Sequence, residues 1–248
     1  MKQAFSLLEL VVVIAILGIL LSVAKFYPQN DKKLQIAAKQ IINDIAYTRN
    51  LALMQGAFRL HSTAVSGKDE WFKARWQLYF IRSKSATNNE QTYTIFLDKN
   101  GDGNANIGKS ALNLDREIAV DILSPAKLMN SGQSGVIGKD DERASKRFNI
   151  EQSYGVTSVE FRGACAGSTR VIFDELGRLH SPLKTANKPY EKLLFHKNTP
   201  CIIRLTNAQK QSLCLVVDAL SGLASVPKAS ANSQKLDFKG KSVECREI

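Results

Sequence analysis

The sequence lacks the motifs by which many hydrolases are recognised. It has no G-x-S-x-G nucleophile turn and no H-E-x-x-H zinc helix. It holds only three histidines, and none of its four cysteines stands in C-x-x-C spacing. These absences argue against a zinc site and a nucleophilic hydrolase. We therefore expect a protein that is not an enzyme and has no small-molecule substrate.

Long hydrophobic runs are also absent, except at the start of the chain. Residues 1–26 read MKQAFSLLELVVVIAILGILLSVAKF, an apolar run interrupted by a single charge, Glu9. About twenty residues of helix span roughly 30 Å, which is enough to cross a bilayer. A carboxylate at mid-membrane costs ~2.5–3.5 kcal/mol, so Glu9 indicates a function and requires a partner.

Two ordinary interpretations of this stretch leave Glu9 unexplained. A secretory signal peptide would have Lys2 in its leader, an apolar region at residues 10–21 and a cleavage site at residues 22–24. A plain membrane anchor would use Lys25 and the polar chain beyond it as its flank. Under either interpretation Glu9 would only add an unfavourable free energy to membrane insertion.

A third interpretation accounts for the acid. The string Ala4-Phe5-Ser6-Leu7-Leu8-Glu9-Leu10 and the apolar run that follows it resemble the N-terminus of type IV pilins and of the pseudopilins of type II secretion. The resemblance implies that a prepilin peptidase cleaves after Ala4 and that Phe5 becomes the N-methylated terminus. It also implies that Glu9 contacts the Phe5 amine of a neighbouring subunit, since each charge satisfies the other. The family prefers glycine at Ala4 and threonine at Ser6.

The same resemblance implies a location and partners. We expect a single-pass protein of the bacterial inner membrane with its head in the periplasm, assembled into a filament in the periplasm or at the cell surface. Its partners would be other pilins or pseudopilins, the prepilin peptidase and the inner-membrane assembly platform. The sequence leaves open whether the filament serves protein secretion, a pilus or competence, where a minor pilin would bind DNA.

Hydrophobic spacing predicts an α+β fold, with an apolar helix at residues 5–27, an amphipathic helix at 28–56 and a β-rich head at 57–248. The resemblance implies in addition that residues 1–4 are the leader, that the first helix lies in the membrane or the filament core, and that the head is extracytoplasmic. The apolar stripe of the second helix contains Leu34, Ala38, Ile41, Ile45, Thr48 and Ala52.

The head is predicted from short aromatic and β-branched runs. Strands are expected at residues 76–81, 93–97, 156–161, 169–173, 201–205 and 214–217. A hairpin turn is expected at Ser221-Gly222, and exposed loops at residues 130–147 and 228–242. The order of helix and strands resembles the H-type pseudopilin and related minor type IV pilins.

The even number of cysteines predicts disulfides in an oxidising compartment. Four cysteines allow three pairings. Cys201 and Cys214 flank a short strand-turn-strand pattern, which favours a bond between them and leaves Cys165 with Cys245.

One loop has the start of an EF-hand-type calcium motif. Asp98, Asn100 and Asp102 occupy its first, third and fifth positions, Gly103 its sixth and Asn104 its seventh. The twelfth position is Lys109 instead of the usual glutamate. The alternative is a turn without metal, since Asp, Asn and Gly suit turns.

The formal net charge of +11 permits a nucleic-acid partner. Basic residues are frequent in the later part of the head, where a common face would follow a phosphate backbone. The candidate DNA contacts are Lys184, Lys188, Lys192, Lys197 and Arg204. The alternative is a soluble surface with excess lysine.

Overall fold

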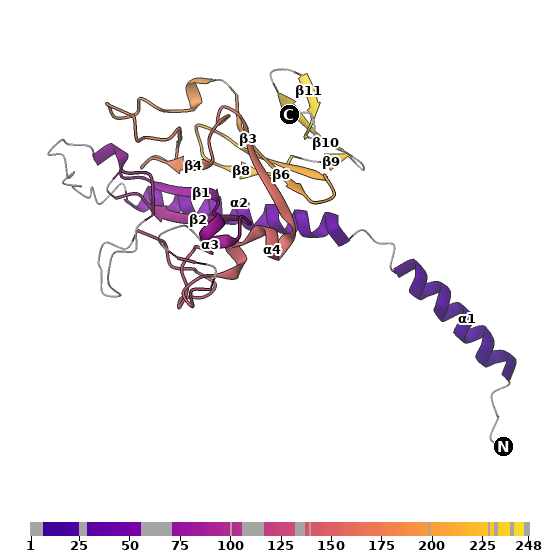
Figure 1. The fold of residues 1–248 in the computed structure, drawn as a ribbon. Coiled ribbons are helices and arrows are strands. Elements are labelled where there is room, and N and C mark those ends of the chain that lie inside the picture. Colours follow the sequence, from indigo (N-terminus) through magenta and orange to yellow (C-terminus); the bar gives the residue numbers. More distant parts are fainter. Residues whose placement is uncertain are drawn as a thin grey trace.

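A computed structural model describes most of the chain. The described residues are 7–24, 29–55, 71–99, 101–105, 117–131, 137–138, 140–197, 199–227, 229–230, 233–238 and 241–245. Two long helices come first, α1 (Leu7–Ala24) and α2 (Gln29–Gln55), and antiparallel sheets follow. The predicted α+β class is therefore confirmed. Figure 1 shows α2 lying against the head and α1 extending away from it.

Helix α2 buries the apolar stripe that its sequence predicts. Leu34, Ala38, Ile41, Ile45 and Ala52 are all buried, together with the hydroxyl-bearing Thr48. Residues three and four apart share one face of a helix, so these side chains form a continuous strip along the core. Pro28, which lies between the two helices in the sequence, is outside the described residues.

Three antiparallel sheets make up the described part of the head. The first has the order β2-β1-β4-β5, with β1 Trp76–Arg82, β2 Gln91–Leu97, β4 Arg170–Phe173 and β5 Leu179–His180. The second has the order β3-β6-β7-β8, with β3 Val156–Gly163, β6 Cys201–Asn207, β7 Ser212–Val217 and β8 Ala224–Ser225. The third has the order β11-β10-β9, with β9 Ala229–Ser230, β10 Ser233–Phe238 and β11 Lys241–Glu244. Each of the six predicted strands has a counterpart.

Short helices complete the described head. They are η1 Trp71–Lys73, α3 Lys84–Thr87, η2 Lys146–Phe148, α4 Ile150–Tyr154 and η3 Phe195–Lys197. Helix α4 begins at Asn149, whose side chain accepts a hydrogen bond from the Gln152 amide, and ends at Gly155 in the left-handed conformation.

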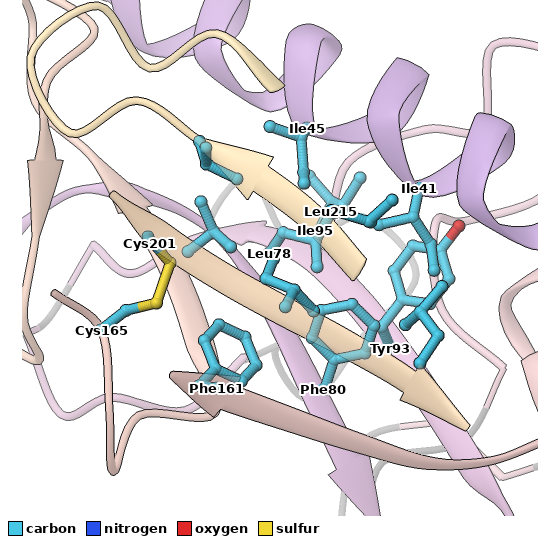
Figure 2. Packing of buried hydrophobic residues seen from close by; sticks show 14 of the residues in the cluster. Ile41, Ile45, Leu78, Phe80, Tyr93, Ile95, Phe161, Cys165, Cys201 and Leu215 are labelled. Atoms are coloured by element: carbon cyan, nitrogen blue, oxygen red, sulfur yellow. A yellow bond between two sulfur atoms is a disulfide. The ribbon is translucent and has the colours of Figure 1, made fainter. Parts of the chain in front are cut away.

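The main core lies between α2 and two of the sheets. Ile41 and Ile45 of α2 belong to the same buried cluster as Leu78 of β1, Ile95 of β2 and Leu215 of β7. Figure 2 shows the two isoleucines of the helix directed toward these strand residues. The helix therefore holds both sheets in one body, since each sheet buries its apolar face against the helix.

The predicted disulfide pairing is wrong. The bonds are Cys165–Cys201 and Cys214–Cys245. In the register of β6 and β7, Cys214 lies opposite Arg204, three residues from Cys201. Successive side chains of a strand point to opposite faces of its sheet, so Cys201 and Cys214 face opposite sides. One disulfide lies in the main core (Figure 2), and the other belongs to a small cluster with Ile202.

Two segments predicted as exposed loops are also different in the structure. The C-terminal tail forms β10 and β11, paired from Lys235–Glu244 to Phe238–Lys241, and Cys245 bonds it to β7. Within 130–147, the described residues Ile137 and Ala144 are buried. The sequence pattern missed both segments because polar residues dominate them and few apolar residues anchor them.

Candidate functional site: the assembly helix and its connection to the head

Helix α1 is apolar on all sides and contacts little of the head. Leu7, Val12 and Leu17 are 81 %, 49 % and 51 % exposed, although they lie on different sides of the helix. Large apolar surfaces exposed to this extent mark sites that lipid or other proteins cover. The exposed apolar surface of α1 therefore indicates that lipid or another protein covers this helix.

Glu9 is the acidic residue in the first turn of α1, and its side chain is exposed. The first turn carries the unpaired backbone N–H groups and the positive end of the helix dipole, which favour a carboxylate there. Ala4 and Phe5 lie outside the described residues, so cleavage, methylation and the contact with Glu9 stay predictions.

A comparison with protein families decides what this segment is. The prokaryotic N-terminal methylation motif matches residues 1–24. The chain has the N-terminus of a type IV pilin-like prepilin. The motif implies processing by a prepilin peptidase, assembly with other pilins and an N-terminus anchored in the membrane, and its family consists of structural subunits. No curated protein and no solved structure matches the chain.

The membrane segment of this prepilin was predicted at residues 5–27. The structure describes α1 over Leu7–Ala24 within that range. Among the described residues, no helix combines the length and the apolar character that crossing a membrane requires.

A buried ionic network connects α2 to the head of the prepilin. The Arg147 guanidinium lies 2.8 Å from Asp44 of α2 and 3.0 Å from Asp121. Asp44 and Asp121 are only 3 % and 1 % exposed. Burial raises the pKa of Asp44 although Arg147 opposes it, whereas hydrogen bonds from Arg147 and Ser145 outweigh burial and lower the pKa of Asp121.

Hydrogen bonds from uncharged side chains extend this network across the helix. The Tyr93 hydroxyl donates to Asp44 at 2.5 Å, and the Gln40 amide donates to Tyr93 and to the Arg147 carbonyl. The Tyr154 hydroxyl donates to the Gln40 carbonyl oxygen. Gln40, Asp44, Tyr93, Arg147 and Tyr154 thus connect α2, β2 and the α4 region, and a lateral displacement of the helix would break several bonds at once.

A second connection lies farther along α2, where two tight turns meet Arg49. Its Nε donates a hydrogen bond of 2.6 Å to the Ser221 carbonyl. Gly177 and Gly222, one from each turn, approach so closely that a Cβ on Gly222 would lie 2.2 Å from the Gly177 oxygen. The predicted turn at Ser221-Gly222 is therefore part of the contact between the helix and the head.

The turn that contains Gly177 is held by a buried carboxylate, Asp174. It accepts hydrogen bonds from the backbone of Leu176 and Arg178 and from the Arg178 side chain, and His180 Nε2 lies 3.3 Å from its Oδ2. Burial raises the pKa of Asp174, but the bonds to His180 and Arg178 outweigh burial and lower the pKa to about 2.

We expect Asp174 to make stability depend on acid pH. A lowered carboxyl pKa stabilises the protein fully above the unfolded value near 4, and that stabilisation is lost as the pH falls through about 2. The free energy of unfolding, measured by urea denaturation from pH 5 to pH 2, should fall more steeply in the wild type than in Asp174→Asn. At pH 7 that variant should be less stable by about 2–3 kcal/mol. If the free energy of unfolding of both proteins fell equally with pH, Asp174 would not be the source of the acid sensitivity.

The predicted calcium loop is folded as a tight turn after β2. Asp98 is buried, and its Oδ2 accepts hydrogen bonds from the Gly103 amide and the Gln77 side chain. Asp102 Oδ1 accepts a hydrogen bond from the Asn104 amide. Burial raises the pKa of Asp98 to about 6, and the charge of Asp102 contributes to this shift. Asn100 lies outside the described residues.

Residues 103–110, GNANIGKS, fit the phosphate-loop pattern G-x-x-x-x-G-K-S. A functional phosphate loop joins a strand to the N-terminus of a helix. Here the pattern follows β2, an edge strand of an antiparallel sheet, and residues 106–116 lie outside the described part. We therefore base no function on it.

The basic residues predicted to contact DNA have mixed surroundings. Arg204 of β6 pairs with Glu160 at 2.6 Å, Lys192 pairs with Glu191 at 3.3 Å, and Lys197 donates to the Ala164 carbonyl. Lys184 and Lys188 are exposed in the segment between β5 and β6. Because three of the five cations make contacts within the chain, they form a weaker phosphate-binding surface than their number suggests.

Proposed function

We propose that the chain is a minor subunit of a pilin-like filament, with α1 in the filament core and the head outside the cytoplasm. The observation that carries the proposal is the methylation motif over residues 1–24 on a helix that is apolar on all sides. In a filament, neighbouring subunits would cover the apolar side chains that the head leaves exposed.

In this proposal Glu9 sets the axial position of the subunit. A carboxylate in an apolar environment is costly unless a cation neutralises it. The amine of a processed Phe5 in an adjacent subunit would supply that cation, and each pair would satisfy two buried charges. The acid therefore penalises an isolated helix and favours a correctly stacked one.

We further propose a pseudopilus of type II secretion as the machine, with the chain as an H-type subunit. Support comes from the order of elements, two long helices followed by antiparallel sheets with a disulfide at the C-terminal end. A pilus or competence filament uses the same N-terminus. We do not adopt DNA binding as the function, because Lys192, Lys197 and Arg204 are engaged within the chain.

Replacing Glu9 tests the assembly role. We expect Glu9→Val and Glu9→Gln to insert into the membrane normally but to enter filaments at least about tenfold less than the wild type. A tenfold loss corresponds to about 1.4 kcal/mol of assembly free energy, which the lost Glu9 contact would supply. The measurement is the fraction of subunit in sheared or cross-linked filaments. Ile16→Val is the matched control in the same helix and should assemble normally.

Mass spectrometry of the mature N-terminus separates processing from assembly. The wild type and both Glu9 variants should begin at N-methylated Phe5. A wild-type terminus at Lys25 would show an ordinary signal peptide and would overturn the proposal. Normal assembly of both Glu9 variants would refute the pairing alone.

A further inference from the structure

We propose that the turn after β2 binds one calcium ion, with the carboxylates of Asp98 and Asp102 as its charged ligands. The Leu97 amide, at the end of β2, donates a hydrogen bond to the Glu117 carbonyl beside this turn. The inference rests on a buried Asp98 oxygen that has no hydrogen-bond partner among the described residues, and on the hydrogen bond that folds the turn toward that carboxylate. It does not depend on the filament assignment.

The unpartnered atom is Asp98 Oδ1. The Asp98 residue is only 5 % exposed, and its Oδ1 is buried without a hydrogen-bond partner among the residues that the structure describes. Buried polar atoms are nearly always paired, and a carboxylate oxygen left without a donor is costly. A bound cation would remove that cost because it would take the place of the missing donor.

The other oxygen of Asp98 organises the loop. Its Oδ2 accepts a hydrogen bond of 3.0 Å from the Gly103 amide, which folds the chain back toward the carboxylate. Gly101 and Gly103 both have positive φ, +70° and +83°, a backbone conformation that suits the sharp turn. The described part of the turn is thus folded toward the Asp98 carboxylate.

Asp102 supplies the second charged ligand from the same turn. The charge of Asp102 acts on Asp98, and the Asn104 amide donates to Asp102 Oδ1 at 2.7 Å, which orients this carboxylate. The Lys99 amide donates to Glu117 Oε1 at 2.7 Å and anchors the start of the loop. The two oriented carboxylates supply hard oxygen ligands of the kind that calcium prefers.

Two features limit the affinity that we expect. The described residues contain no group of three or more His, Cys, Asp or Glu side chains arranged to hold a metal. The Arg170 guanidinium also lies beside the loop, donating to the Gly103 carbonyl and to Gln77. With few charged ligands and a neighbouring cation, the site belongs to the weak class, with Kd of about 10⁻⁴–10⁻³ M.

Thermal unfolding of the detergent-solubilised full chain tests the site. Calcium chloride at a few millimolar, compared with chelator, should raise the Tm by about 3–6 °C, because a ligand that binds only the folded state stabilises it by mass action. Isothermal titration with calcium chloride should give one site per chain. Magnesium should give a smaller shift, since it demands a stricter octahedral shell.

Asp102→Asn is the decisive variant, because it keeps the side-chain shape and the bond to Asn104 and removes only the charge. It should fold and lose most of the calcium-dependent shift. Asp141→Asn, which alters a surface acid paired with Arg143, is the matched control and should keep the shift. The proposal is wrong if calcium leaves the wild-type Tm unchanged, or if Asp102→Asn responds as the wild type does.

Discussion

Arg147→Met is expected to lower the free energy of unfolding of the head by about 3–5 kcal/mol. The substitution leaves Asp44 and Asp121 buried without the guanidinium that lies 2.8 Å and 3.0 Å from them. Removing one partner of a buried ion pair lowers stability by far more than the intact pair contributes, because the remaining charge keeps its desolvation penalty. Urea denaturation followed by circular dichroism measures the change.

The matched control is Arg143→Met, four residues earlier. Arg143 pairs with Asp141 at 2.7 Å but is 44 % exposed in its side chain, so water screens this pair. Its loss should cost no more than about 1 kcal/mol. Adding Asp44→Asn to Arg147→Met should restore part of the lost stability, since one uncompensated charge is then removed. A cost for Arg147→Met as small as that of Arg143→Met would show that the network does not hold α2.

The network also bears on how a filament subunit works. If α1 is held by neighbouring subunits, any force on the filament reaches the head through α2 and its contacts. We therefore expect Arg147→Met to detach the helix from the head more readily. Increased protease cleavage between α2 and the first sheet would report that loosening.

Gly222→Ala is expected to destabilise the head by about 3 kcal/mol or more. Gly222 has φ +69°, and an added Cβ would lie 2.2 Å from the Gly177 oxygen and 2.8 Å from Phe173 Cε1. The side chain would thus meet backbone and a buried ring, neither of which can move without disturbing the contact with Arg49. Chemical denaturation measures this change as well.

Gly167→Ala separates the clash from the backbone conformation. Gly167 has φ +79°, but a Cβ there would have no atom within 4 Å. This control should therefore lose only about 1–2 kcal/mol, the usual cost of placing a side chain in the left-handed region. If Gly222→Ala and Gly167→Ala lost equal stability, the turns that contain Gly177 and Gly222 could move apart without a free-energy cost.

Local sequence features predicted much of the fold. The spacing of Leu34, Ile41 and Ile45 predicted the buried face of α2, and β-branched and aromatic runs predicted six strands. These predictions succeed because helix and strand periodicity depend on residues close together in the chain. The tail strands β10 and β11 were missed because their polar sequence carries no such period.

The covalent order of residues 1–24 by itself determined the type of N-terminus, since leader, phenylalanine and Glu9 are recognised by their positions along the chain. Only the tertiary structure decided which cysteines bond and what Arg147 does. Cys201 and Cys214 are close in sequence, yet the strand register turns them to opposite faces. The sequence pattern predicted Arg147 in an exposed loop, but folding places it between Asp44 and Asp121, which are 103 and 26 residues away along the chain. Such contacts follow from register and burial, which no short stretch of sequence encodes.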